Sequence, residues 1–103
     1  MGVEVRDNRD ESRYEVFTDG QLAGFSQYRL GDGRITFVHT EIDHDYEGSG
    51  LGSRLARAAL DDSRTRNLEV VPQCPFIAGY IRRHPEYIDL VVPAFRAGVT
   101  AGG

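Results

Sequence analysis

The first 42 residues alternate apolar and polar side chains with the period of two that is typical of half-buried β-strands. A charged run at residues 8–11 and the glycines at 31 and 33 interrupt this pattern. Asp19-Gly20 lies between two β-rich stretches and predicts a tight hairpin, because type I′ turns require positive φ at both central positions. We therefore predict an antiparallel meander of four strands, at residues 3–8, 14–18, 21–30 and 34–42.

The fourth predicted strand divides its side chains between two faces. Strict alternation places Ile35, Phe37, His39 and Glu41 on one face and Thr36, Val38, Thr40 and Ile42 on the other. Both sets contain large apolar side chains, so at least one face must be buried.

The second half of the chain changes to a helical period. Residues 51–66 carry an apolar stripe that ends near Leu60, because the next position on it is the charged Asp62. The stripe consists of Leu51, Leu55, Ala58 and Ala59, while Arg57 and Arg64 are expected on a solvated opposite side. Asn67 is the expected stop, and residues 68–72 form a short fifth strand that ends at Pro72.

Beyond Pro72 the pattern predicts one more helix, one more strand and a tail. Pro75 suits a first helical turn, and apolar residues follow at helical spacing until the break at His84-Pro85. Residues 87–92 read as a final strand. The Ala- and Gly-rich residues 94–103 are expected to form a frayed, flexible tail after a single domain at 1–93.

Composition narrows the functional classes. With 103 residues and 40% hydrophobic side chains, the chain fits one compact domain. Its basic residues are 12 Arg and no Lys, against 16 acidic residues, for a net charge of -4. Nucleic-acid binding draws on many cationic phosphate contacts, and the Arg residues here are interspersed with acidic ones, so we expect no nucleic-acid partner.

Cysteine content and the N-terminal sequence favour the cytoplasm. The lone Cys74 cannot form an intramolecular disulfide or supply a multi-cysteine metal site, so neither a disulfide nor a metal is expected. The first residues contain no apolar signal-peptide segment, and no run approaches the ~18 apolar residues of a membrane span. We expect a cytoplasmic protein without a membrane partner.

A glycine loop follows the fourth strand and opens the first helix. It reads Glu47-Gly48-Ser49-Gly50-Leu51-Gly52-Ser53. Free N–H groups and the positive helix end converge there, glycines let the backbone approach a phosphate, and the serines add hydroxyls. A plain turn before a Ser-capped helix explains the same residues equally well. No Gly-Lys-Ser/Thr follows, and an antiparallel meander precedes the loop, so neither a Walker A loop nor a dinucleotide fingerprint is present.

With its context, this loop resembles the pyrophosphate loop of the GNAT superfamily of acyl-CoA-dependent N-acetyltransferases, Gln/Arg-x-x-Gly-x-Gly/Ala between a β-meander and a helix. Both glycine positions match, but Glu47 stands where Gln or Arg is usual, which leaves phosphate binding to backbone donors. The segment from Cys74 to Tyr80 resembles the later GNAT helix, with Cys74 in place of the usual Asn. Cys-Pro-Phe followed by His84-Pro85-Glu86-Tyr87 is similar to the small stand-alone YjdJ-type branch. The resemblance covers about residues 3–92.

This resemblance implies an α/β (α+β) fold, with a mostly antiparallel sheet splayed between its fourth and fifth strands and about two main helices. Acetyl-CoA would be the co-substrate, and the acceptor would be a small-molecule or protein amine that attacks the thioester directly. The implied cofactor-binding residues are Thr40, Ile42, Glu47, Gly48, Ser49, Gly50, Leu51, Gly52, Ser53, Cys74, Phe76 and Tyr80.

The same resemblance suggests catalytic roles. Tyr80 would protonate the departing thiolate, and Glu41 or His39 would be the base that deprotonates the amine. His44 is a third candidate base, although it lies in a loop. Cys74, at a helix N-terminus, would be either an acyl-accepting nucleophile or a small residue packed against the cofactor arm.

Two other functions remain open from the sequence. The chain is short for a GNAT enzyme, so it could be a non-catalytic acyl-CoA-binding or protein-interaction module. It could also be a phosphate-binding interaction domain unrelated to CoA. The sequence leaves the acceptor and the oligomeric state open.

Overall fold

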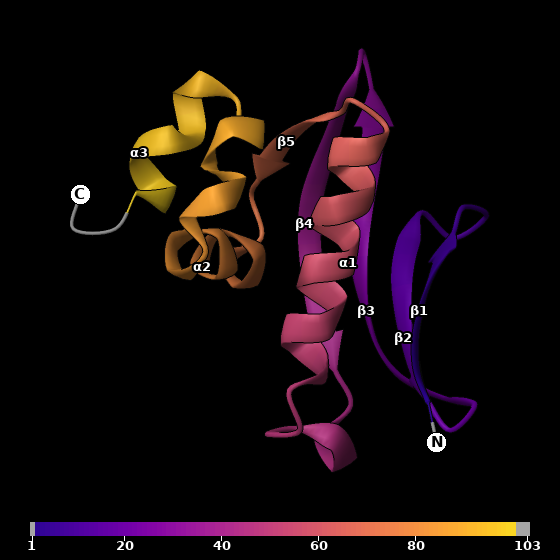
Figure 1. Cartoon of the computed structure of the whole chain (residues 1–103). Helices are drawn as coiled ribbons and strands as arrows, with labels where there is room; N and C mark the ends of the chain where they lie inside the picture. The colour runs from indigo at the N-terminus through magenta and orange to yellow at the C-terminus, as the bar shows by residue number, and fades with distance from the viewer. Residues whose placement is uncertain (1, 101–103) are drawn as a thin grey trace.

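The computed structural model describes residues 2–100, which form one five-stranded sheet with helices packed against it (Figure 1). The strands are β1 (Val3–Asn8), β2 (Arg13–Thr18), β3 (Gln21–Gly31), β4 (Arg34–Ile42) and β5 (Glu69–Pro72), and they lie in chain order across the sheet. The first four are antiparallel, and β5 pairs parallel to β4. This mixed architecture confirms the predicted α/β fold class with its mostly antiparallel sheet.

The local signals for turns and helix ends are confirmed. Asp19 and Gly20 join β2 to β3 with φ values of 50° and 81°, as a type I′ hairpin requires. The helix α1 (Leu51–Thr65) connects β4 to β5 and ends just before Asn67, whose φ of 57° is left-handed. A parallel neighbour for β4 needs a crossover of this kind, and α1 provides it.

A β-bulge in β4 overturns the predicted alternation of that strand. The β3–β4 register shifts between Gln27 and Tyr28, which face His39 and Phe37, so Val38 is an extra residue. Ile35 and Phe37 are fully buried, whereas His39 and Glu41 are exposed. The prediction that these four residues share one face is therefore wrong, because one extra residue exchanges the faces of everything that follows.

The core lies between α1 and the strands. The helix buries Leu51, Leu55, Ala56, Ala59 and Leu60. Ala58, predicted in the stripe, is only half-buried, and the unpredicted Ala56 is fully buried. At the far end of α1, Asp62 accepts a hydrogen bond of 2.6 Å from the hydroxyl of Tyr14 on β2, so the end of the apolar face is tied to the sheet by a polar contact.

The C-terminal segment differs most from expectation. After α2 (Pro75–Arg83), the chain forms a 3₁₀ helix at Pro85–Leu90, so the predicted strand at 87–92 is wrong. One isolated parallel bridge, from Val70 to Val91, is all that this segment adds to the sheet among residues 2–100. A 3₁₀ helix at Pro93–Phe95 and α3 (Arg96–Val99) follow, and Val99 is buried. The frayed structure expected from residue 94 is thus absent through α3, and residues 101–103 lie outside the described range.

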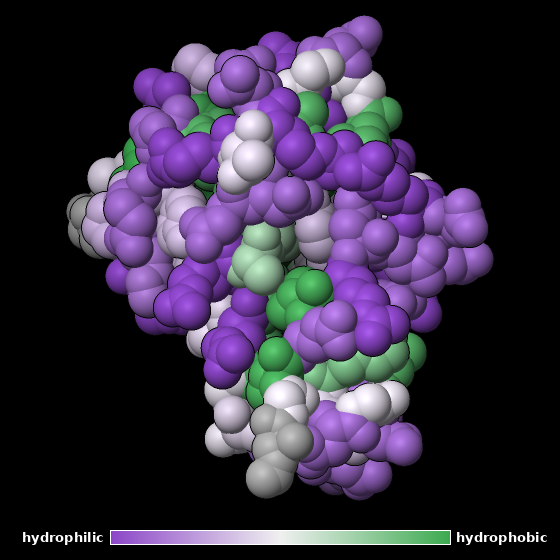
Figure 2. All heavy atoms as spheres, turned by 45° about the vertical axis from the view of Figure 1, so that its right-hand side comes forward, coloured by the Kyte–Doolittle hydropathy of each residue, from purple (hydrophilic) through white to green (hydrophobic). Residues whose placement is uncertain are grey.

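The face shown in Figure 2 is mostly hydrophilic, with apolar side chains visible only in small groups. Among residues 2–100, no helix combines the length and the apolar character that crossing a bilayer requires.

Candidate functional site

The sheet opens between β4 and β5. The two strands pair from Arg34 with Glu69 to Phe37 with Pro72, and within residues 2–100 no strand continues this pairing along the rest of β4. The backbone N–H of Cys74 donates to the carbonyl of Phe37 at 2.8 Å, and the chain then leaves the sheet as α2. The segment of β4 that ends at Ile42 therefore has a strand edge available to an extended ligand.

The N-terminus of α1 opens into the same region. Gly50 is the N-cap residue, with φ 81° and ψ 3°, and it supplies no side-chain hydrogen bond to the helix. The first turn contains no acidic side chain. The N–H groups of Leu51, Gly52 and Ser53 have no partner within the helix, so they and the helix dipole attract an anion. The alternative interpretation of the loop, in which a serine caps this helix, is therefore wrong.

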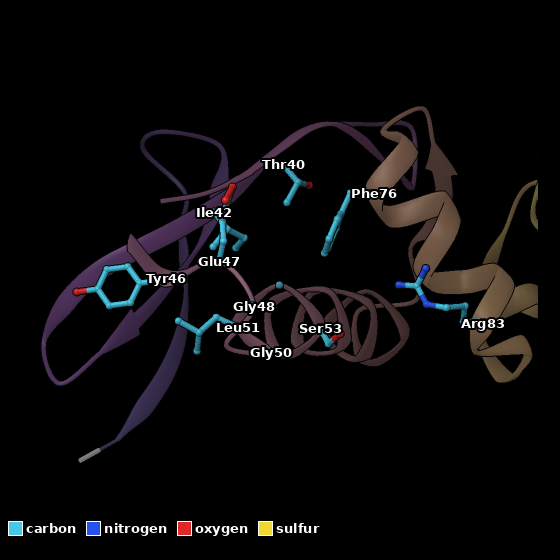
Figure 3. A pocket seen from close by; sticks show the side chains of 11 residues that line it. Thr40, Ile42, Tyr46, Glu47, Gly48, Gly50, Leu51, Ser53, Phe76 and Arg83 are labelled. Atoms are coloured by element: carbon cyan, nitrogen blue, oxygen red, sulfur yellow. The ribbon is translucent and has the colours of Figure 1, made fainter. Parts of the chain in front are cut away.

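A cavity of about 390 Å³ lies between this helix end, β4 and α2 (Figure 3). It is lined by Thr40, Ile42, Tyr46, Glu47, Gly48, Gly50, Leu51, Gly52, Ser53, Phe76 and Arg83. Nine of these eleven were predicted from the sequence as cofactor-binding residues. The exceptions are Tyr46, from the 3₁₀ helix His44–Tyr46, and Arg83, from the last turn of α2. We refer to this space as the main cavity.

One wall of the main cavity is a contact between α1 and α2. A Cβ built on Gly52 would lie 2.6 Å from Cζ of Phe76 and 3.6 Å from Cγ1 of Ile42, so the phenyl ring sits directly over the first turn of α1. Phe76 remains partly exposed, at 36%. The glycine thus leaves room for an aromatic wall beside the helix N-terminus.

The rest of the glycine loop consists of Glu47, Gly48 and Ser49, of which only Ser49 does not line the main cavity. The hydroxyl of Ser49 donates to the carbonyl of Tyr46, and Ser49 does not line the main cavity. Glu47 does line it, and its Oε1 lies 3.3 Å from Nδ1 of His44, an ion pair when the histidine is protonated. Gly48 has φ 80°, a left-handed conformation that favours glycine.

Cys74 lies at the point where β4 and β5 diverge. It is 2% exposed, and its Sγ is 3.2 Å from Oγ1 of Thr40. The hydroxyl of Thr40 also lies 2.9 Å from Oγ of the buried Ser26. The thiol is therefore held in a small polar chain behind the main cavity and does not line it.

Tyr80 does not line the main cavity either. It is 3% exposed and borders a separate cavity of about 200 Å³, together with Ser53, Arg54, Arg57 and His84. Its ring stacks on His84 with 4.1 Å between centroids. Burial raises the pKa of Tyr80, so its hydroxyl keeps its proton at neutral pH. Because Ser53 borders both cavities, Tyr80 lies next to the main cavity without opening into it.

The candidate bases lie on the other face of β4. Nε2 of His39 is 2.7 Å from Oε2 of Glu41, and both side chains are more than half exposed. Glu41 also borders a cavity of about 150 Å³ with Leu22, Ala23, Gly24, Phe25 and Asp43. The structure brings these two residues together, as predicted, but directs them away from Ile42 and the main cavity. Within residues 2–100, no three His, Cys, Asp or Glu side chains are grouped as metal ligands would be.

Comparison with known proteins agrees with this geometry. A family model described as GCN5-related N-acetyl-transferase matches residues 13–90. Protein NATD1 from Mus musculus is 26% identical over 95 residues, covering 88% of this chain and 86% of the mouse protein. Protein NATD1 from Xenopus tropicalis is 24% identical over 95 residues, covering 88% and 87% respectively.

Solved structures show the same fold. A GCN5-like protein from Staphylococcus aureus superimposes with a TM-score of 0.66 at 22% identity, covering 86% of this chain and 87% of that one. A ribosomal-protein-alanine N-acetyltransferase from Brucella melitensis gives a TM-score of 0.55 at 20% identity, covering 78% and 60%.

Proposed function

Because this chain belongs to the GCN5-related N-acetyltransferase family, we propose that it moves an acetyl group from acetyl-CoA to an amine. The acceptor is a small molecule or a protein, and the reaction needs no metal ion. One observation carries the proposal: the uncapped N-terminus of α1 opens into a cavity of about 390 Å³ beside the unpaired segment of β4. Membership of the narrower YjdJ-type branch is part of the same proposal.

The residues present fit a CoA-shaped ligand in two respects. The free N–H groups from Gly50 to Ser53 suit a pyrophosphate, and the edge of β4 between Thr40 and Ile42 suits the amides of a pantetheine arm. The proposed cofactor-binding residues that line the main cavity are Thr40, Ile42, Glu47, Gly48, Gly50, Leu51, Gly52, Ser53 and Phe76 from the sequence, with Tyr46 and Arg83 added from the structure. The other three residues predicted from the sequence do not line this cavity: Ser49, Cys74 and Tyr80. When bound, acetyl-CoA supplies the thioester carbon that the amine attacks.

The base in this proposal is the His39–Glu41 pair. An alkylamine with an unperturbed pKa near ~10.4 is protonated at neutral pH and must lose a proton before it can attack. Glu41, whose Oε2 lies 2.7 Å from His39 Nε2, would orient the imidazole toward the acceptor. Either residue could take the proton first, and the acceptor would then approach from the face of β4 opposite the main cavity.

The acid in this proposal is Tyr80, whose phenol is protonated at neutral pH. It would need to reach the thiolate from its neighbouring cavity. In the two-step alternative, the thiol of Cys74 would accept the acyl group first and pass it to the amine. The burial of this thiol and its contact with Thr40 favour a packing role over this route.

A specific observation favours the rival function, a non-catalytic acyl-CoA-binding module. Tyr80, His39 and Glu41 do not line the main cavity, so the structure assembles a binding site more completely than a catalytic one. Such a module would bind acetyl-CoA in the same place without turnover.

Turnover separates the two functions. Thiol release from acetyl-CoA should be measured with a panel of amines and basic peptides, for wild type, Tyr80→Phe, His39→Gln and Glu41→Gln. The enzyme proposal expects amine-dependent release in wild type and a loss of about 10²-fold or more in at least one variant. Binding of acetyl-CoA without amine-dependent release from any acceptor would support the binding module instead.

A further inference from the structure

The arginines of this protein differ in whether the guanidinium group has a hydrogen-bond or ion-pair partner. Of the 12 arginines, all within residues 2–100, eight use the guanidinium in a hydrogen bond or an ion pair. The other four make neither within that range: Arg29, Arg54, Arg57 and Arg83. In a chain with 16 acidic residues, an arginine without a carboxylate partner is conspicuous.

Three of these four gather beside the main cavity. Arg54 and Arg57, from consecutive turns of α1, border the cavity of about 200 Å³ between α1 and α2. Arg83, on the last turn of α2, borders the main cavity, and its side chain extends from α2 toward that space in Figure 3. Ser53 borders both cavities and joins them. We refer to Arg54, Arg57 and Arg83 as the arginine groove.

The three unpaired guanidinium groups of the arginine groove favour the binding of an anion. Like charges on neighbouring turns repel each other, so the groove weakens the fold unless a ligand neutralises it. Guanidinium groups donate in a planar fork that matches phosphate oxygens. The first turn of α1 already offers N–H groups for one anion, so the groove, one to two turns further along the helix, offers a second and separate anion site.

We propose that the arginine groove binds the 3′-phosphate of CoA and so makes this protein selective for CoA over 3′-dephospho-CoA. The inference rests on the proposed function. In CoA the 3′-phosphate is carried by the ribose that is attached to the pyrophosphate, so its site must adjoin the helix end that binds the pyrophosphate. This phosphate is a monoester with a charge of about −1.5 to −2 at pH 7, which is more than the single negative charge on each phosphorus of the pyrophosphate diester. The arginine groove is the most cationic site beside the main cavity, so we assign the 3′-phosphate to it.

Calorimetric titration tests the proposal without relying on activity. Wild type is titrated with CoA and with 3′-dephospho-CoA at low ionic strength, alongside the double variant Arg54→Gln/Arg57→Gln. The matched control is Arg29→Gln, which removes the fourth unpaired arginine at a site on β3 away from the groove. Wild type is expected to bind CoA about tenfold or more tightly than 3′-dephospho-CoA. The preference should shrink at high salt, because exposed charges are screened.

The variants decide the assignment. In the groove variant the preference for CoA should fall to about threefold or less, while its affinity for 3′-dephospho-CoA stays within about twofold of wild type. Arg29→Gln should keep the wild-type preference. Equal binding of both ligands by wild type would overturn the inference and leave the proposed function intact, as would an equal effect of Arg29→Gln. Failure of wild type to bind either ligand would overturn both.

Discussion

The glycine at the N-cap of α1 gives a direct perturbation of the proposed phosphate site. Gly50 has φ 81° and ψ 3°, and a Cβ added there would meet no atom within 4 Å. Gly50→Ala is therefore strained only in its backbone, at a cost of about 1–2 kcal/mol for a left-handed alanine. For a domain of this size, each kcal/mol lowers the melting temperature by about 4–8 °C.

The effect on binding should be larger than the effect on stability alone. Relief of the strain rotates the peptide that leads into Leu51 and Gly52, whose N–H groups are the proposed anion donors. Hydrogen bonds to charged groups are worth about 1.5–3 kcal/mol each, so misaligning one weakens CoA binding by about 10- to 100-fold. Affinity is measured by isothermal titration calorimetry, at a temperature about 20 °C below the melting temperature of the less stable variant. Both variants are then folded during the titration, so unfolding does not contribute to the measured affinity.

A matched control variant distinguishes the effect of backbone strain from the effect on the proposed phosphate site. Gly33, in the β3–β4 turn, has φ 75° and no atom within 4 Å of an added Cβ, so Gly33→Ala carries similar strain away from the main cavity. Both variants should melt earlier by similar amounts, and only Gly50→Ala should lose CoA affinity. Equal affinities for the two variants would refute the reasoning.

Further predictions concern the walls of the site and the core. Gly52→Ala should weaken CoA binding, because its Cβ would displace the ring of Phe76, and it should have little further effect in a Phe76→Ala background; additive losses in calorimetry would contradict the contact. Burial, and then the hydrogen bond to Asp7, raises the pKa of Tyr28 to about 12, above its unfolded value of about 10. The contribution of protonated Tyr28 to the free energy of unfolding is therefore fully present below about pH 10 and is lost as the pH rises toward 12. In urea denaturation, the free energy of unfolding should fall less between these pH values in Tyr28→Phe than in wild type. An equal fall in the two proteins would contradict the prediction. Cys74, at 2% exposure, should react with a thiol reagent only on unfolding, and immediate stoichiometric labelling would contradict its burial.

Much of the fold follows from local signals in the sequence. Asp19-Gly20 sets a two-residue turn, Asn67 accepts the left-handed φ that ends α1, and Pro75 begins α2. Each feature depends on the backbone preferences of one or two residues, so no knowledge of distant contacts is needed. The glycine loop falls in the same class, because its place after β4 and before α1 is set by the order of these elements.

The bulge in β4 could not be predicted in this way. It is defined by how β4 pairs with β3, where Val38 has no single partner, and pairing is a property of two strands. Its consequence is large, because it turns His39 and Glu41 away from the face of the buried Phe37. The relation of the candidate bases to the main cavity therefore became visible only in the structure.

In the C-terminal segment, the local sequence pattern and the tertiary contacts favour different secondary structures. The apolar residues between Tyr87 and Val92 have strand propensity, yet the chain forms a 3₁₀ helix from Pro85. Contacts with α1 favour this helix: the hydroxyl of Tyr87 donates to Asp61 at 2.6 Å, and Arg64 donates to both oxygens of Asp89 at 2.8 and 2.9 Å. Tertiary contacts of this kind override propensity.

The sequence did not predict that Arg83 borders the main cavity, for a related reason. Its charge was evident in the sequence, but a helix of nine residues has several solvated positions, and only the packing of α2 against α1 selects the one that borders the main cavity. The position of an arginine on a helix surface becomes informative once the neighbouring helix is known.

Backbone NMR of the labelled protein, titrated with acetyl-CoA, tests the central claim most directly. The account predicts saturable shifts that are largest at the amides of Gly48–Ser53, followed by those of β4 between Thr40 and Ile42, which adjoin the main cavity. No saturable shifts at millimolar acetyl-CoA, or shifts confined to residues away from these two segments, would contradict it.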